Sequence, residues 1–238
     1  MRWLLHNINI DFGGPMTAKL FLSAIAKFAL GVVLIGALLF LPAGTMAYPQ
    51  GWLLMGILFI PMFLAGLVMM AKNPALLKSR LSAKEKEREQ SLVVKLSGLM
   101  FLVGFILAGL SFRYGWWMLP RWVSIVGTVL FLGSYALYAE VLRENTWLSR
   151  TIEVQEGQQV VSTGLYGIVR HPMYMATLVL FLSMPLVLRS ALAFVVFLAY
   201  PAIIAGRLLD EERFLAAELP GYSEYMQKVK WRLIPFIW

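Results

Sequence analysis

The sequence predicts an all-α fold: a polytopic integral membrane helical bundle with four long spans and a short C-terminal helical hairpin. Hydrophobic residues make up 60% of the 238 residues, charged residues only 14%, and the mean hydropathy is +0.73. A soluble globular chain carries about 25% charged residues, so this chain has too few to cover a surface that faces water. This composition excludes a soluble enzyme and a disordered protein.

Four apolar runs are long enough to cross a bilayer, whose core of ~30 Å requires about 20 helical residues. They are Leu20–Leu41, Trp52–Ala71, Leu92–Phe112 and Trp122–Val141. Each is expected to be helical because lipid offers no hydrogen-bond partner to a free backbone amide. The first run has 22 residues, which exceeds the apolar core of about 7–15 residues in a signal peptide, so we expect it to be retained.

The last apolar region is different, because a single Arg189 divides it into two short arms. Met173–Leu188 and Ser190–Ala205 have 16 residues each. A helix of that length measures roughly 24 Å, less than the hydrocarbon core of ~30 Å. The region therefore predicts a tight hairpin, here called hairpin 173–205. We expect a single structural domain, with transmembrane helices in residues 1–141 and a second region, which contains the hairpin and the candidate site, in residues 142–238.

The positive charges predict the orientation of the spans. With the N-terminus inside, 16 Lys and Arg residues fall on inner segments, whereas the outer loops hold only Arg113, Arg121 and Arg189. Lys and Arg gather on the cytoplasmic side of membrane proteins, so we expect an inner (cytoplasmic) membrane protein with both termini in the cytoplasm. No basic helix with interleaved aromatic residues lies outside the spans, so nucleic acid is not an expected partner.

Composition also limits the chemistry. The chain has no cysteine and only two histidines, His6 and His171, which excludes disulfides, thiol nucleophiles and thiolate metal sites. A metal site built from histidines is not expected either. No strand–helix–strand unit occurs, so a Rossmann dinucleotide site is excluded.

Two polar segments, Leu142–Pro172 and Gly206–Trp238, flank hairpin 173–205 and must therefore meet. In the first, Arg170-His171-Pro172 precedes the hairpin, and Pro172 suits the first turn of a helix. His171 then lies at a helix N-terminus, which favours an anionic group. The alternative is that His171 only caps the helix and Arg170 binds a lipid phosphate.

In the second segment, Arg207 and Glu211 are four residues apart and share one helix face. Glu212 points about 100° further round. The alternative is a solvated ion pair, worth only ~0.3–0.5 kcal/mol. Because the pair directly follows an apolar run, near the membrane interface, a binding role is an equal possibility.

These motifs together resemble the isoprenylcysteine carboxyl methyltransferase family, and the wider group that includes bacterial phospholipid N-methyltransferases is similar. The resemblance lies in Gly-x-Tyr at 164–166, Arg-His-Pro-x-Tyr at 170–174, Arg-x-x-x-Glu-Glu at 207–212 and Gly-Tyr-x-x-Tyr at 221–225. It covers roughly residues 145–235. It implies a cytoplasmic pocket for S-adenosyl-L-methionine, with S-adenosyl-L-homocysteine as the product.

The resemblance also implies roles for individual residues. The positions that line the cofactor pocket in the family correspond to Tyr166, His171, Pro172, Met173 and Tyr174. The position of Glu211 contacts the cofactor and that of Arg207 contacts the methyl acceptor, and Glu212 is an alternative to Glu211. Gln155–Gln158 lies where the family has further pocket residues, although the match is loose, and Gln155 is the candidate cofactor-binding residue in it. Leu219-Pro220-Gly221 departs from the Phe-Gly turn that is usual in the family.

The chemistry of a carboxylate acceptor suits these residues. Methyl transfer from a sulfonium to a carboxylate merges two charges into none, so it gains from a site without water. A carboxylate is already ionised and needs no general base, and Arg207 would orient it as a forked partner. An amine acceptor would have to lose a proton, and Arg207 would repel it. We expect a lipophilic acceptor that enters from the surrounding membrane lipids.

Three alternatives stay open. The first is N-methylation of a phospholipid amine. The second is an NADPH-dependent membrane reductase, in which Arg143, Arg150 and Arg170 would bind the 2′-phosphate. The third is a transporter in which Arg207 and Glu211 guard a polar path, although the chain lacks the paired halves or broken helices of many transporters.

Overall fold

The computed structural model describes residues 18–72, 77, 88–145, 147–148 and 152–238, and these residues form helices and loops without a β-strand. The helices are α1 (Ala18–Ala43), α2 (Pro49–Lys72), α4 (Arg88–Tyr114), α5 (Arg121–Glu144), η2 (Gly164–Gly167), α6 (Pro172–Val187), α7 (Ala191–Phe197), α8 (Ala199–Glu218) and α9 (Tyr222–Lys228). The all-α prediction is confirmed. His6, Arg150 and the charged stretch 82–87 lie outside the described residues.

Five helical segments among the described residues are long and apolar enough to cross a membrane. Four of them, α1, α2, α4 and α5, correspond to the four predicted runs. The fifth is Ala191–Glu218, 28 residues long, whereas the sequence predicted a short arm that ends at Ala205. The helix continues beyond this arm because no proline follows the apolar run before Pro220, so charged residues extend the same helix out of the span.

The first arm of the hairpin is short, as predicted. Helix α6 has 16 residues and contains Pro185 in its last turn. Arg189, which has a left-handed φ of 60°, lies in the turn to α7. Ser190 then caps α7, because its side chain accepts a hydrogen bond from the backbone amide of Ala193.

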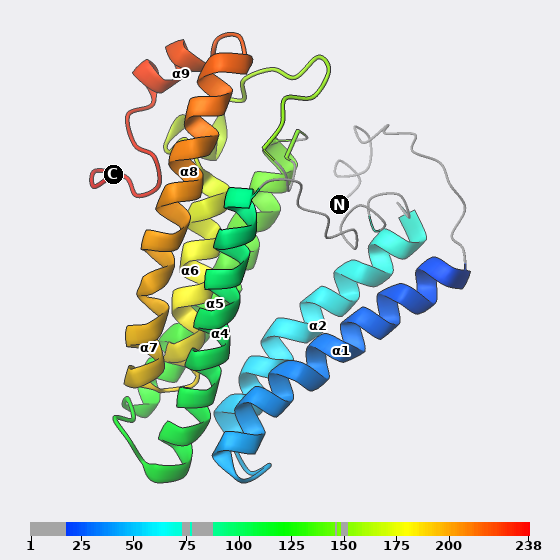
Figure 1. Cartoon of the computed structure of the whole chain (residues 1–238), viewed down its shortest axis with the longest axis vertical. Helices are drawn as coiled ribbons and strands as arrows, with labels where there is room; N and C mark the ends of the chain where they lie inside the picture. The colour runs from blue at the N-terminus through cyan, green and yellow to red at the C-terminus, as the bar shows by residue number, and fades with distance from the viewer. Residues whose placement is uncertain (1–17, 73–76, 78–87, 146, 149–151) are drawn as a thin grey trace.

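Helices α4 to α8 form one bundle, and the α1–α2 hairpin leans away from it (Figure 1). Glycines permit the closest helix contacts. A Cβ at Gly109 on α4 would lie 2.6 Å from the carbonyl oxygen of Leu39 on α1, and one at Gly127 on α5 would lie 2.7 Å from the amide nitrogen of Val187 on α6. Both separations are too short for any side chain, so larger residues would push these helices apart.

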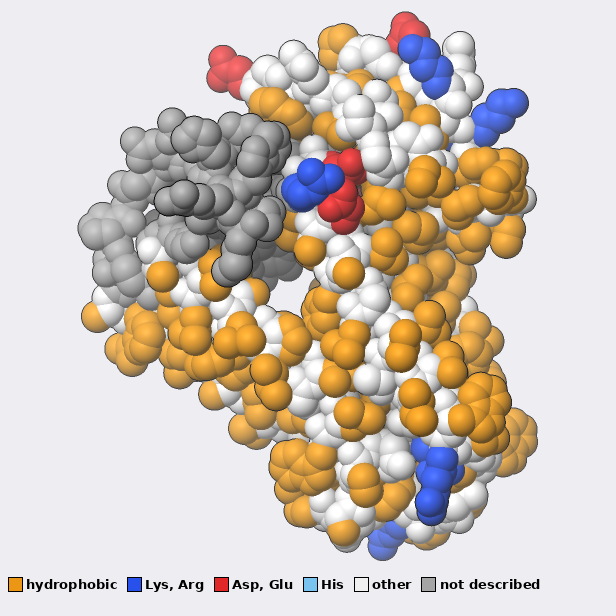
Figure 2. Space-filling model, turned by 180° about the vertical axis from the view of Figure 1, so that it is seen from behind, with side chains coloured by type: hydrophobic (Ala, Val, Ile, Leu, Met, Phe, Trp, Pro, Cys, Tyr) orange, Lys and Arg blue, Asp and Glu red, His pale blue; other side chains and the backbone are white. Residues whose placement is uncertain are grey.

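The interior of the bundle is apolar and aromatic. Phe197 of α7 packs edge-on against Phe101 of α4, with ring centroids 5.4 Å apart. Hydrophobic side chains also cover much of the outer surface, and charged side chains lie above and below this apolar zone (Figure 2). This distribution is that of a protein whose sides face lipid and whose ends face water.

At one end of the bundle, three segments that are distant in the sequence meet. The backbone amides of Arg170 and His171 donate to the carbonyl oxygens of Trp231 and Arg232, both at 2.9 Å. A second, smaller core lies beside this pairing. It consists of Leu219, Tyr222, Tyr225 and Val229, with Val154 and Val160 packed against it. The loop before α6, the end of α8 and the C-terminal tail therefore form one polar end of the molecule.

Candidate functional site

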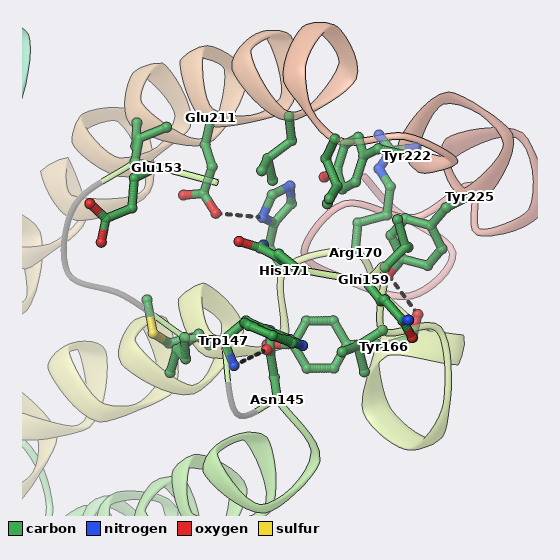
Figure 3. Close-up of a pocket in the computed structure, with 18 of the residues that line it drawn as sticks. Asn145, Trp147, Glu153, Gln159, Tyr166, Arg170, His171, Glu211, Tyr222 and Tyr225 are labelled. Carbon is green, nitrogen blue, oxygen red and sulfur yellow. Dashed lines mark hydrogen bonds and ion pairs between the residues drawn. The ribbon is translucent and has the colours of Figure 1, made fainter. Parts of the chain in front are cut away.

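A pocket lies at this end of the bundle. The loop that follows α5, the residues around η2, helix α8 and helix α9 contribute its walls (Figure 3). Six of the predicted site residues line it: Tyr166, His171, Met173, Tyr174, Arg207 and Glu211.

The end of α5 fixes the wall that η2 forms. Gly164 has a left-handed φ of 51°, and the carboxylate of Glu144 occupies the space where a Cβ would be. That carboxylate accepts a hydrogen bond from the amide of Leu165, at 2.9 Å. The side-chain amide of Asn145 donates to the hydroxyl of Tyr166, also at 2.9 Å. Two adjacent polar residues of α5 and its C-cap therefore hold the turn in place.

Tyr166 is buried, and both its hydroxyl and its backbone carbonyl oxygen form hydrogen bonds. The hydroxyl of Tyr225 donates to the carbonyl oxygen of Tyr166 at 2.7 Å. Burial raises the pKa of Tyr166 to about 12, although the hydrogen bond from Asn145 acts in the opposite direction. Its hydroxyl therefore remains protonated at physiological pH.

His171 lies at the N-cap of α6, and Pro172 occupies the first turn, as the sequence predicted. The imidazole makes no capping hydrogen bond. It lies instead between two carboxylates: its Nδ1 is 3.9 Å from Glu211 and its Nε2 is 3.2 Å from Glu212. Figure 3 shows the contact with Glu211 across the pocket.

Glu211 belongs to a connected row of polar groups along the pocket. The hydroxyl of Tyr174 donates to the Glu211 carboxylate. The guanidinium Nε of Arg207 donates to the same hydroxyl at 3.1 Å. The structure thus links Arg207 and Glu211 through Tyr174, a connection that their spacing along the helix did not indicate.

Glu212 points away from the pocket into a buried network. Its carboxylate lies 2.6 Å from the Nε of Arg170 and 2.8 Å from the Nε of Arg232 in the C-terminal tail. Arg170 also donates to the carbonyl oxygens of Met226 and Val229, at 3.3 and 3.1 Å. Glu212 therefore joins the His-Pro turn to the tail, and it does not line the pocket, unlike Glu211.

Two further predicted residues also lie outside the pocket lining. Pro172 is buried at the start of α6. Gln155 is held by its own loop, where its side-chain amide donates to the carbonyl oxygen of Trp147 at 2.9 Å and its backbone amide donates to Gln158. Gln158, at the other end of the predicted range Gln155–Gln158, lines the pocket.

Several lining residues were missed by the sequence analysis. They include Asn145, Trp147, Glu153, Gln159 and Tyr222. Asn145 directly follows a predicted span. The polar character of the loop after it was the only feature of the sequence that could have indicated a pocket residue there. Tyr222 belongs to the Gly-Tyr-x-x-Tyr motif, to which the sequence analysis assigned no role.

The fold and the site define a class: a polytopic α-helical membrane protein with a pocket of polar, aromatic and apolar side chains at one end of its bundle. Residues 125–217 match the family model described as the isoprenylcysteine carboxyl methyltransferase (ICMT) family. The resemblance predicted from the motifs is thereby confirmed for this region, which contains η2, α6, α7 and most of α5 and α8.

The chain is also similar to curated proteins and to a solved structure. It is 30% identical over 132 residues to the cobalt-zinc-cadmium resistance protein CzcN of Cupriavidus metallidurans, over 53% of this chain and 57% of that protein. It is 32% identical over 91 residues to the Delta(14)-sterol reductase of Mus musculus, over 37% of this chain and 22% of that protein. The matched part thus spans less than two thirds of either relative.

The solved structure is that of a eukaryotic intramembrane Ras methyltransferase, an isoprenylcysteine carboxyl methyltransferase. It superposes with a TM-score of 0.58 at 19% identity, over 90% of this chain and 77% of that chain. This similarity extends beyond the region of the family model and confirms the fold of the whole bundle.

Proposed function

We propose that the protein is an S-adenosylmethionine-dependent methyltransferase that acts on a lipophilic acceptor, and that the reaction is O-methylation of a carboxylate. The linked row of Arg207, Tyr174 and Glu211 along the pocket wall carries the proposal. It provides a cationic group for an acceptor beside an anionic group for a cationic ligand. The family match of residues 125–217 supports it.

The residues of the pocket fit S-adenosylmethionine. The carboxylate of Glu211 suits the ammonium or ribose hydroxyls, because it accepts charge-assisted hydrogen bonds. The aromatic faces of Tyr166 and Tyr174 attract a cation. When bound, S-adenosylmethionine supplies an electrophilic methyl group on a sulfonium sulfur.

Arg207 is the proposed binding residue for the acceptor. It precedes Glu211 by about one helical turn, or ~5.4 Å, so it lies closer to the apolar part of α8. A guanidinium binds a carboxylate through paired hydrogen bonds and fixes its direction of approach. The hydroxyl of Tyr174 contacts both side chains and so connects the two proposed binding groups.

The surroundings of the pocket favour an acceptor that comes from the membrane. Figure 2 shows an opening between two parts of the molecule, with acidic and basic side chains near its upper end. Trp147, Leu148, Ile152 and Met173 add apolar surface to the pocket lining. An acceptor with an apolar tail and a carboxylate head matches this combination.

A reductase site is less well supported. Arg170, a candidate for binding the 2′-phosphate of NADPH, already donates to Glu212 and to two backbone carbonyl oxygens. Arg143 pairs with Glu140 on the exposed surface of α5, at 2.5 Å. Arg150 lies outside the described residues.

Transfer of a radiolabelled methyl group to lipids in reconstituted bilayers tests the proposal. We expect the label in an ester that mild base hydrolyses, with acidic lipids as acceptors. Arg207→Ala should abolish the signal, whereas Arg213→Ala, an exposed arginine on the same helix, should retain it. Label in a base-stable methylamine would contradict carboxyl methylation, and no transfer to any lipid would contradict the methyltransferase.

A further inference from the structure

Tyr222 is a pocket residue to which the proposed function assigns no task. It lies at the start of α9, lines the pocket, and is only 5% exposed. Among the buried side chains of the described residues, its hydroxyl is the polar group without a hydrogen-bond partner. A buried hydroxyl without a partner costs free energy, so its retention at a pocket wall requires a reason.

The neighbouring Tyr225 shows that a hydroxyl without a partner is not common to both tyrosines of the Gly-Tyr-x-x-Tyr motif. Both tyrosines lie on the short helix α9, and their rings are 5.6 Å apart. The hydroxyl of Tyr225 donates to the backbone of Tyr166 and so has a structural partner. The hydroxyl of Tyr222 is buried and has no such partner within the described chain, and Tyr222 is one of the residues that line the same pocket.

The surroundings of Tyr222 show what kind of group would accept its proton. Val160, Leu215 and Leu219 line the pocket and belong to the small core that contains Tyr222 and Tyr225. Figure 3 shows Tyr222 and Tyr225 on one side of the pocket and Glu211 and Glu153 on the other. The wall around Tyr222 thus combines apolar and aromatic surface with the polar side chains of Arg170 and Gln159, and the opposite side carries the carboxylates of Glu211 and Glu153.

The hydroxyl of Tyr222 is a donor throughout the physiological range. Burial, together with the nearby carboxylates of Glu212 and Glu211, raises the pKa of Tyr222. A flat heteroaromatic ring with acceptor nitrogens satisfies both the apolar wall and this donor, whereas an ammonium group satisfies neither. Adenine is such a ring, and a charged amino-acid group suits the acidic side instead.

We propose that Tyr222 is a ligand-binding residue whose hydroxyl donates a hydrogen bond to the adenine ring of the bound nucleoside, in the apolar part of the pocket. The inference rests on the proposed function, because it assumes an adenosyl ligand. It adds a specific contact and an orientation of the bound ligand. The adenine ring would lie between α9 and the end of α8, and the amino-acid part would point towards Glu211.

The test uses Tyr222→Phe, which removes only the hydroxyl. Calorimetry on the purified full-length protein in detergent measures the affinity for S-adenosylhomocysteine and for 5′-methylthioadenosine, which lacks the amino-acid part. Loss of one neutral hydrogen bond should weaken both ligands by the same factor, roughly three- to tenfold. Tyr114→Phe, at an exposed tyrosine at the end of α4, should leave both affinities unchanged.

Thermal unfolding of the ligand-free variants provides the second measurement. Tyr222→Phe should unfold at the same or a higher temperature than the wild type, since it removes a buried group without a partner. Tyr225→Phe should unfold at a lower temperature, because the carbonyl oxygen of Tyr166 loses its donor. This opposite behaviour separates a ligand-binding hydroxyl from a structural one.

The results that overturn the inference are distinct from those that overturn the proposed function. Unchanged affinity of Tyr222→Phe, or weaker S-adenosylhomocysteine binding with unchanged 5′-methylthioadenosine binding, would refute the adenine contact. A lower unfolding temperature would show that the hydroxyl has a structural partner. If the wild type binds neither ligand, the proposed function itself fails.

Discussion

Gly164 is the position where a single methyl group should disrupt the site most directly. Its φ of 51° is left-handed, and a Cβ there would lie 1.5 Å from Oε1 of Glu144. The Glu144 carboxylate also accepts the hydrogen bond of the Leu165 amide. Gly164→Ala must therefore displace the side chain that holds η2, and with it Tyr166 in the pocket wall.

The size of the effect follows from two separate costs. A left-handed conformation costs an alanine about 1–2 kcal/mol. Loss of the hydrogen bond to the Glu144 carboxylate costs about 1.5–3 kcal/mol. Gly164→Ala should therefore lower the free energy of unfolding by about 2.5–5 kcal/mol, a large part of the ~5–15 kcal/mol typical of a folded domain.

Gly115→Ala is the matched control for Gly164→Ala. Gly115 has a φ of 69°, but nothing lies within 4 Å of its Cβ position. It should show only the conformational cost of about 1–2 kcal/mol. Denaturation in detergent and calorimetry with S-adenosylhomocysteine measure both variants, and only Gly164→Ala should lose affinity. Equal destabilisation of the two variants, with equal affinity, would refute the reasoning.

A double variant tests the role of Glu144 itself. In Glu144→Ala/Gly164→Ala the clash disappears, because the shortened side chain no longer reaches the turn. The combined loss of stability should therefore be smaller than the sum of the two single losses, as expected for residues in contact. Additive losses would show that Gly164 and Glu144 act independently.

Three further variants examine other parts of the account. Arg207→Ala should retain S-adenosylhomocysteine affinity and lose methyl transfer, since Arg207 is assigned to the acceptor; retained transfer would place the acceptor elsewhere. Arg232→Met removes a guanidinium 2.8 Å from the Glu212 carboxylate. It should lower the free energy of unfolding by about 1–2 kcal/mol in denaturant titration, because a partly exposed ionic hydrogen bond is lost. Arg232→Lys should recover part of this loss, and equal stability of the wild type and both variants would contradict the network around Glu212. The chain has no cysteine, so a single cysteine can be placed at an exposed side chain and labelled with an impermeant maleimide. Trp117→Cys should be labelled from the outside, and Arg213→Cys from the cytoplasmic side. Labelling of both variants from the same side would contradict the predicted orientation.

The sequence predicted the four long spans well because a bilayer permits few solutions for an apolar run. It judged the last span by its apolar run alone, which ends at Ala205, and so predicted an arm too short for the bilayer core. The helix itself continues, because no proline occurs between Gly206 and Glu218. Arg207 and Glu211, which were expected on one helix face, therefore lie on the continuous helix α8 between the apolar segment and the pocket.

The motifs predicted many of the residues that form the site, but they did not predict the position and contacts of each residue in it. Glu211 and Glu212 differ by about 100° in direction, and the partners of Glu212 include Arg232, twenty residues later, a contact that local sequence patterns do not indicate. The contribution of Glu144 and Asn145 was not predictable, because polar residues at the end of a span are ordinarily solvated. Their importance follows from the fold of η2 against them.

Equilibrium binding of S-adenosylhomocysteine to the purified wild-type protein tests the central claim most directly, namely that this pocket holds an adenosyl ligand with Glu211 on its wall. The account predicts saturable binding at one site by calorimetry, strong weakening in Glu211→Gln, and no competition by NADPH. Absence of binding, equal affinity in Glu211→Gln, or displacement by NADPH would contradict it.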